Sequence, residues 1–285
     1  MACCLVLEEV RVRSVDPTEV RLDYANDVDC PVYREAVFVN ECDGAPVMLA
    51  THVPRSALRS VRGWCLSTKS WAGTSAGTTG NRLGGFVNPL ITFGSTAPVA
   101  LRRRFGVSMS GLNQREPVGA GLLDRLGVLA WGEFSSLLPD SAETQIRMLD
   151  RCDPTWLVGG STGWTSGVVN KTSVLPYHFD SGNIAGSWNA QVVLRDRIGG
   201  GALHCPSIVT LDGRSVALAC DDASLILFDG QSRMHGVTPL VRRRGGYRYS
   251  IVYYAKAAMT EAGSPRSELL KAKRRAATSG LGESN

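Results

Sequence analysis

Short alternations of hydrophobic and polar residues dominate the second half of the chain. They occupy residues 188–195, 202–208, 211–220, 223–229 and 247–255. A period of two is the spacing of a β-strand that buries one face, and turn residues such as the glycines at 199–201 separate the runs. No helical pattern interrupts them, so we expect an antiparallel sandwich or barrel from about residue 172 onward.

The first half of the chain gives fewer signals. Residues 8–15 and 34–40 alternate as strands with one exposed face would. Residues 63–85 are rich in Gly, Ser and Thr and contain Trp64 and Trp71. Two interpretations of this loop stay open: its indoles stack on nucleic-acid bases, or they pin a surface loop to the body of the protein.

One amphipathic helix is predicted before the β region. Hydrophobic residues recur there at steps of three and four, which is the spacing of one helix face. They are Leu123, Leu126, Ala130, Phe134 and Leu137. We expect Pro139 to end this helix and Asp140 or Ser141 to cap a second helix over residues 142–152. Both helices are expected to buttress the sheet.

These patterns predict a mainly β protein with three segments. Residues 1–169 form an α/β extension, residues 170–258 form the β core, and residues 259–285 form a basic tail. The tail is expected to be mobile and to contain a short helix that begins near Ser267.

Composition is that of an ordinary globular protein. Of the 285 residues, 44% are hydrophobic and 20% are charged, so a sizeable core can form. No apolar run approaches the roughly 20 residues that span a bilayer. The N-terminus lacks the basic region of a signal peptide, and the 8 cysteines contain no CxxC pair that would favour a zinc ribbon. The sequence therefore predicts a soluble intracellular protein with reduced thiols and no membrane partner.

Positive charge is clustered along the chain. The net charge is +5, and basic residues gather at 102–104, 242–244 and 271–275. Such clusters suit a polyanionic partner, because each Lys or Arg beside a phosphate releases counterions. The alternative is a solvated charged surface, and charge alone does not decide between the two.

Two histidines and one aspartate form a candidate metal site. His178 and Asp180 lie two residues apart, so in an extended segment their side chains project to the same face. His235 follows 55 residues after Asp180, behind the strand-like run 223–229. Two imidazoles and one carboxylate are the ligands of non-heme Fe(II) oxygenases, which keep the remaining positions open for a co-substrate and O₂.

A candidate anion site follows on the last strand. Arg248 comes 13 residues after His235, and Ser250 shares its face. A guanidinium binds a carboxylate through two parallel hydrogen bonds, and the hydroxyl adds a third donor. Two rivals exist: His204 as a metal ligand, and the arginines at 242–244 as carboxylate ligands. We expect His204 to be a packed core residue, and the arginines to face solvent or phosphate.

With these residues in place, the stretch from about 170 to 256 resembles the Fe(II)/2-oxoglutarate-dependent dioxygenases, with their HxD…H and R-x-S motifs. The resemblance implies a double-stranded β-helix (jelly-roll) core. It also implies Fe(II) held by His178, Asp180 and His235. The 2-oxoglutarate co-substrate would be held by Arg248 with Ser250.

Within that superfamily, H-x-D-x-x-N ending at Asn183 is most similar to the TET/J-binding-protein branch, which oxidises the 5-methyl group of nucleic-acid bases. The resemblance implies that Asn183 contacts a flipped 5-methylcytosine. Ser-Gly-Asn is also ordinary turn chemistry, so a purely structural role for Asn183 stays open. The animal enzymes have a further base-contacting histidine after the arginine, whereas here no histidine follows His235 and Lys256 lies in that neighbourhood.

The resulting expectation is a compact enzyme, similar to the TET-like proteins of bacteriophages, which would act in the host cytoplasm. It would use Fe(II), 2-oxoglutarate and O₂ to oxidise 5-methylcytosine in DNA to 5-hydroxymethylcytosine. Alternatives are the same chemistry on thymine or on a substrate that is not nucleic acid, or a non-catalytic jelly-roll binding module. The extent of oxidation and the oligomeric state stay open.

Overall fold

The computed structural model describes residues 5–15, 30–72, 89–98 and 105–278. They fall into two compact units that interleave along the chain. The first unit lies within Met1–Ile91, Val168–Ser181 and Ala185–Val252, and the second within Thr92–Gly167, Gly182–Ile184 and Tyr253–Asn285. The predicted segment boundaries at 169 and 258 stay a prediction. A bilayer-spanning segment is not found among the helices that the structure describes.

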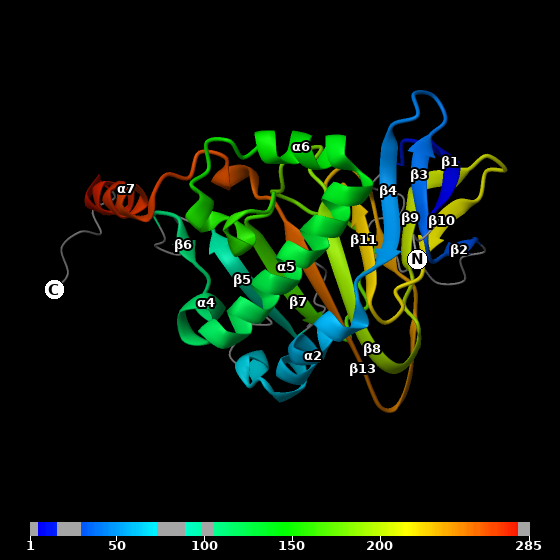
Figure 1. The fold of residues 1–285 in the computed structure, drawn as a ribbon, viewed down its shortest axis with the longest axis horizontal. Coiled ribbons are helices and arrows are strands. Elements are labelled where there is room, and N and C mark those ends of the chain that lie inside the picture. Colours follow the sequence, from blue (N-terminus) through cyan, green and yellow to red (C-terminus); the bar gives the residue numbers. More distant parts are fainter. Residues whose placement is uncertain (1–4, 16–29, 73–88, 99–104, 279–285) are drawn as a thin grey trace. The chain divides into compact units, whose positions relative to one another are not determined.

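The first unit is built on a mixed β-sheet (Figure 1). Its strands are β1 (Val6–Val12), β2 (Val32–Tyr33), β3 (Ala36–Asn40), β4 (Pro46–His52), β8 (Asn189–Gly200), β9 (Leu203–Thr210), β10 (Ser215–Leu218), β11 (Ser224–Phe228), β12 (Gly236–Val237) and β13 (Leu240–Tyr254), whose last two residues belong to the second unit. The strand order is β2-β10-β9-β1-β3-β4-β11-β8-β13, and β12 pairs with β9. The predicted β runs of the second half are thus confirmed as strands.

The N-terminal strands are hydrogen-bonded into the middle of this sheet. β1 pairs antiparallel with β9 and parallel with β3, and β4 pairs antiparallel with β11. One face of the sheet encloses a continuous hydrophobic core, to which alternate residues of seven strands contribute. Its fully or nearly buried members are Val10, Ala36, Phe38, Val47, Met48, Ala50, Val193, Leu203, Cys205, Ile208, Val216, Leu218, Cys220, Ile226 and Phe228. We call this side of the sheet its inner face.

The two indoles of the predicted loop serve packing. Trp64 is buried in α2 (Leu58–Ser67), and Trp71 lies in the short 3-10 helix Ser70–Ala72. The Trp71 ring stacks on Tyr249 with ring centroids 5.6 Å apart, and its Nε1 donates to the carbonyl of Cys65 at 3.2 Å. These contacts favour the interpretation that the indoles pin the segment to the body. Residues 73–85 of that loop lie outside the described residues.

The second unit carries most of the helices. They are α4 (Gly111–Arg115), α5 (Pro117–Leu137), α6 (Pro139–Arg147) and α7 (Pro265–Thr278), with β6 (Ser108–Met109) and parts of β5 (Leu90–Thr96) and β7 (Ser166–Lys171) beside them. The predicted face of α5 is confirmed, since Leu123, Leu126 and Ala130 are buried. The prediction that Asp140 or Ser141 caps the next helix was wrong. Pro139 is itself the first residue of α6, a position whose N–H needs no partner.

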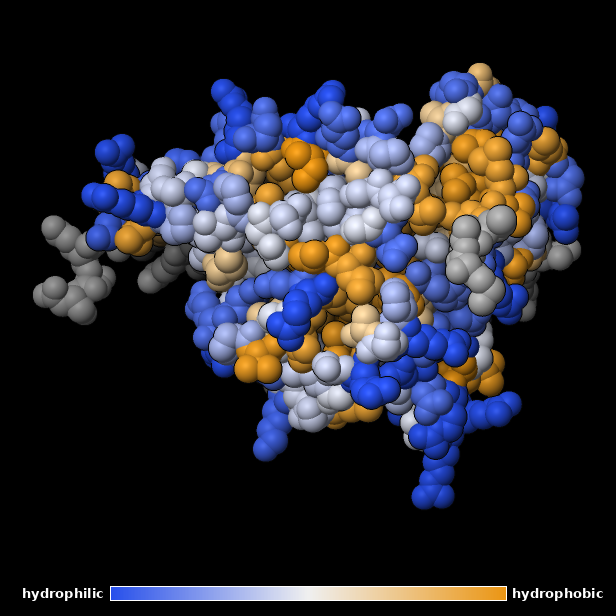
Figure 2. Space-filling model, in the orientation of Figure 1, coloured by the Kyte–Doolittle hydropathy of each residue, from blue (hydrophilic) through white to orange (hydrophobic). Residues whose placement is uncertain are grey.

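Helix α7 is held in the second unit by a buried carboxylate. Glu268 is 3% exposed, although Figure 2 shows mostly hydrophilic residues over this helix. Its carboxylate accepts hydrogen bonds from the backbone N–H groups of Gly263 and Val107 and pairs with Lys271 at 2.6 Å. Burial alone would raise the pKa of Glu268, but the Lys271 and backbone donors outweigh it and hold the pKa below its ordinary 4.5.

Replacing Glu268 by glutamine is therefore expected to loosen α7 at neutral pH. The variant loses about 1–2 kcal/mol of stability, because a charged acceptor becomes a neutral amide facing N–H donors. A depressed pKa stabilises the folded state above the unfolded-state pKa, so the difference from wild type shrinks as pH falls through the folded pKa. Hydrogen exchange of α7 amides at neutral and acid pH measures this.

The matched control is Glu261→Gln. Glu261 pairs at 2.9 Å with Arg151, and both side chains are 73% exposed, so this pair contributes little. Equal exchange rates for α7 in the two variants at neutral pH would contradict the account of Glu268.

Candidate metal centre

Backbone pairing brings the two predicted histidine ligands together. The His178 N–H donates to the His235 carbonyl at 3.0 Å, and the His235 N–H donates to the His178 carbonyl at 3.0 Å. Residues that exchange both bonds in an antiparallel bridge lie directly opposite each other, with their side chains on one side. The Asp180 N–H donates to the Gly230 carbonyl at 2.9 Å. This bond fixes the aspartate beside the segment that leads to His235.

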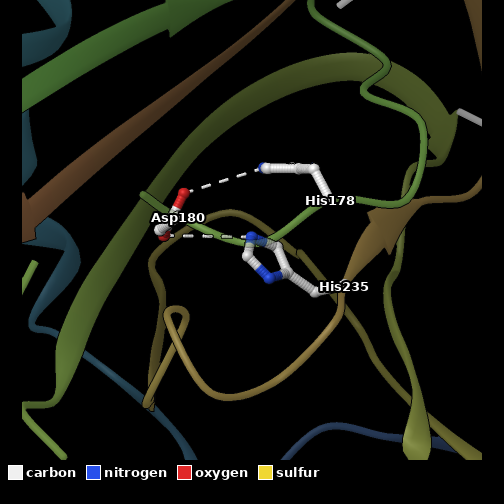
Figure 3. A group of neighbouring side chains, drawn as sticks. All are labelled: His178, Asp180 and His235. Atoms are coloured by element: carbon white, nitrogen blue, oxygen red, sulfur yellow. Dashed lines mark ion pairs between the residues drawn. The ribbon is translucent and has the colours of Figure 1, made fainter. Parts of the chain in front are cut away.

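The three side chains converge on one point (Figure 3). The His178 Nε2 lies 3.7 Å from Asp180 Oδ1, and the His235 Nε2 lies 3.9 Å from Asp180 Oδ2. One ligand atom from each residue can be chosen so that all three atoms lie within 4.8 Å of one another. This spacing fits one metal ion among three protein ligands, with the opposite positions left for other ligands.

Each histidine is held in the tautomer that a metal ligand needs. The Nδ1 of His178 lies 2.8 Å from the Pro176 carbonyl, and the Nδ1 of His235 lies 3.0 Å from the Arg233 carbonyl. A carbonyl only accepts hydrogen bonds, so both Nδ1 atoms carry the proton. Both Nε2 atoms therefore present a lone pair to the site.

Burial keeps His235 neutral. It lowers the pKa of His235 to about 4, with repulsion from His178 adding to the effect. The imidazole is thus uncharged at neutral pH, as metal binding requires. Asp180 is oriented by Asn189, whose Nδ2 donates to Oδ2 at 2.7 Å.

Gly230 leaves no room for a side chain beside the aspartate. A Cβ there would overlap Asp180 Oδ2 and would lie 2.5 Å from Asn189 Nδ2. Gly230→Ala is therefore expected to displace the carboxylate and to weaken metal binding by roughly 10–100-fold, the effect of losing a supporting partner. Metal titration measures the loss.

Gly63→Ala provides the control for that substitution. Gly63 lies in α2 with nothing within 4 Å of the added Cβ. This variant should keep the wild-type metal affinity. Wild-type affinity in Gly230→Ala would show that Asp180 is not confined in this way.

Arg248 supplies a buried cation with spare donors. The residue is 1% exposed, and its Nη1 donates to the Ser173 carbonyl at 3.4 Å. Within the described residues, its Nε and Nη2 are buried without a hydrogen-bond partner. Such donors fit the two oxygens of a carboxylate. Ser250 is also buried and shares the Arg248 face of β13.

The turn before β9 lies beside the guanidinium, and the start of β9 pairs next to a metal ligand. Gly236, which follows His235, pairs with His204, while the Arg248 Nε lies 3.6 Å from where a Cβ of Gly201 would be. Both contacts therefore lie close to the point where β9 begins at Leu203. A ferrous ion plus Arg248 would balance the charges of Asp180 and a dicarboxylate, as a buried site requires. The residues present thus fit Fe(II) and 2-oxoglutarate, the cofactors that the sequence predicts.

His204 is not a ligand. Its Nδ1 is bonded to the Tyr177 hydroxyl at 2.5 Å and its Nε2 to the Ser215 hydroxyl at 2.7 Å. Burial, with the Arg13 charge, lowers the pKa of His204 to about 4. Both ring nitrogens are occupied, so the expectation of a packed core histidine agrees with the structure.

No sequence motif marks two residues that support the metal ligands. Asn189 and Gly230 orient and confine Asp180, but neither belongs to a motif. Asn189 had one usable signal, which is a polar residue at the start of the largely hydrophobic run 189–194. Gly230 had none beyond its place in a turn.

Asn183 belongs to the second unit. It is buried and lies opposite Lys256 in an antiparallel bridge. Its predicted contact with a base stays a prediction. The arginines at 102–104 lie outside the described residues, whereas those at 242–244 are exposed on β13.

The fold of this chain is similar to that of a solved structure. The structure of NgTET1 in complex with 5mC DNA matches with a TM-score of 0.58 over 88% of this chain and 90% of that chain, at 12% identity. The chain has the fold of NgTET1. The predicted fold class, a jelly-roll core with an α/β extension and buttressing helices, is confirmed, and the resemblance to the TET-like branch holds at the level of the fold.

Two further structures match this chain less well. A 2OG-Fe(II) oxygenase family oxidoreductase from Burkholderia pseudomallei matches with a TM-score of 0.27 over 32% of this chain and 41% of that chain, at 17% identity. A prolyl-4-hydroxylase from Pseudomonas putida gives 0.42 over 73% and 92%, at 12% identity. No protein-family model and no curated protein matches the sequence.

Proposed function

We propose that the protein is an Fe(II)/2-oxoglutarate-dependent dioxygenase. His178, Asp180 and His235 hold the metal, and Arg248, with Ser250, holds the distal carboxylate of the co-substrate. One combination of observations carries the proposal: three convergent ligands with both histidines in the ligand tautomer, and a buried guanidinium with two unused donors. The shared fold of NgTET1 supports it.

When bound, iron and 2-oxoglutarate would react with O₂ to oxidise a C–H bond of the substrate to an alcohol. In the same reaction 2-oxoglutarate is converted to succinate and CO₂. The chain itself positions the ligands for this chemistry. Asn189 orients Asp180, the carbonyls of Pro176 and Arg233 fix the imidazoles, and burial of Arg248 keeps water from the carboxylate site.

The proposed substrate is 5-methylcytosine in DNA, which the enzyme would convert to 5-hydroxymethylcytosine. NgTET1 has been solved in complex with 5mC DNA, and this chain shares its fold. The H-x-D-x-x-N motif and the net charge of +5 support the same substrate class. Asn183 is proposed to contact the base after it is extruded from the stack.

Mass spectrometry of nucleosides tests this substrate. Methylated and unmethylated duplexes of one sequence are incubated with the full chain, Fe(II) and 2-oxoglutarate, then digested. We expect 5-hydroxymethylcytosine from the methylated duplex alone, and none with the His235→Ala variant. Oxidised thymine in both duplexes would move the substrate to thymine, and no new nucleoside in either would remove the nucleic-acid claim.

A further inference from the structure

A buried glutamine follows Asn189 on the inner face of β8. Gln191 lies opposite Ile226 of β11, and Asn189 lies opposite Phe228. Ile226, Phe228 and Val193 all belong to the core on the inner face. Because side chains of a strand alternate between faces, Gln191 shares this face with Asn189, which holds the metal-site carboxylate.

The other end of β8 runs beside the strand that carries Arg248. Two contacts set the direction: a Cβ on Gly246 would touch the Arg197 carbonyl, and a Cβ on Gly199 would lie 3.7 Å from Val241. From the first contact to the second, the residue number rises along β8 and falls along its neighbour β13. The two strands are therefore antiparallel. Counting back from Arg197 places Ser250 near Val193. Val193 of β8 thus lies beside Ser250 of β13. The next residue of β8 on the inner face, in the direction of Asn189, is Gln191.

Gln191 is slightly exposed, although its neighbours on β8 are fully buried. It keeps 8% exposure, whereas Ala190, Val192 and Val193 have none. Its Nε2 donates to the Cys220 sulfur at 3.4 Å. A thiol is a weak hydrogen-bond acceptor. The Gln191 amide would therefore form a stronger hydrogen bond with a ligand carboxylate than with Cys220.

We propose that Gln191 binds the 2-oxo acid end of 2-oxoglutarate, donating an amide hydrogen bond to its carboxylate. The proposal rests on the proposed function. With the distal carboxylate on Arg248 and the other end at the metal, the co-substrate extends past the position that Gln191 occupies between Ser250 and Asn189. Gln191 is thus a co-substrate-binding residue, held by Cys220 while the site is free.

Anaerobic titration of the Fe(II)-loaded protein with 2-oxoglutarate tests this role. The visible charge-transfer absorption of the iron–keto acid complex reports binding without turnover. Gln191→Leu is expected to weaken 2-oxoglutarate binding about tenfold, the effect of one hydrogen bond to a charged group. Gln191→Glu keeps the size and adds like charge, so a larger loss is expected, and this variant carries the test if the leucine variant does not fold.

Two controls separate the contact from general damage. Cys220→Ala removes the glutamine's partner in the free protein and should leave 2-oxoglutarate affinity unchanged. Fe(II) binding alone, measured before 2-oxoglutarate is added, should be equal in wild type and Gln191→Leu. Unchanged 2-oxoglutarate affinity in Gln191→Leu, an equal loss in Cys220→Ala, or a loss of Fe(II) binding in Gln191→Leu would each overturn the proposal.

The experiment also separates this proposal from the proposed function. If the wild-type protein gives no charge-transfer absorption, the dioxygenase proposal itself fails. If the absorption forms and Gln191→Leu binds as tightly as wild type, the role of Gln191 alone is overturned.

Discussion

His235→Ala is expected to eliminate stoichiometric Fe(II) binding and all 2-oxoglutarate turnover. His235 supplies one of three protein ligands, and its neutral ring is held with Nε2 facing Asp180. Losing a ligand costs more than the roughly 10–100-fold loss of affinity that follows removal of a supporting partner. Metal analysis of the purified protein after anaerobic loading gives the stoichiometry.

His52→Ala is the matched control for that substitution. His52 is another histidine of the first unit, and its Nδ1 pairs with Glu35 at 2.9 Å, away from the three ligands. This variant should bind one iron per chain. Full iron content in His235→Ala would contradict the assignment of the third ligand.

Arg248→Met is expected to have opposite effects on stability and on co-substrate binding. Without a ligand, Arg248 is a buried cation with two unused donors, so an apolar side chain of similar length should stabilise the protein by about 1–4 kcal/mol. The same change removes the carboxylate's partner and weakens 2-oxoglutarate binding by about 100-fold or more, corresponding to roughly 3 kcal/mol. Thermal unfolding with and without 2-oxoglutarate measures both effects.

Arg195→Met is the control that separates the effect of removing Arg248 from the effect of removing any buried arginine. The Arg195 guanidinium is also largely buried, but it donates to the carbonyls of Gly200 and Cys220 at 3.0 and 2.9 Å. Its loss removes these hydrogen bonds to backbone carbonyls, so this variant should unfold at a lower temperature. If Arg248→Met were destabilised like Arg195→Met and still gained stability from 2-oxoglutarate, Arg248 would not be the carboxylate site.

The metal ligands were predictable from sequence because few residues can do this chemistry. The chain has 4 histidines, and the pair His178–Asp180 followed by His235 within a run of strands left few alternatives. The strands themselves show a period of two that is local and visible. The pairing of His178 with His235 is not local, and the sequence predicted it only through the ligand set.

The order of the strands and the residues that support Asp180 could not be predicted from the sequence. They depend on contacts between distant residues, which no local pattern encodes. Nothing in residues 8–15 indicates that β1 enters the sheet between β9 and β3. The start of α6 was misjudged because Pro139 was expected to end a helix, whereas a proline fits equally well as a first helical residue. Gly230 and Asn189 act through contacts with Asp180 that appear only when the chain is folded.

Anomalous diffraction at the iron edge, from crystals grown anaerobically with Fe(II) and 2-oxoglutarate, tests the account most directly. We expect one iron peak within bonding distance of His178, Asp180 and His235, with the co-substrate extending from it to Arg248. An iron peak elsewhere, or no peak at these three residues, would contradict it.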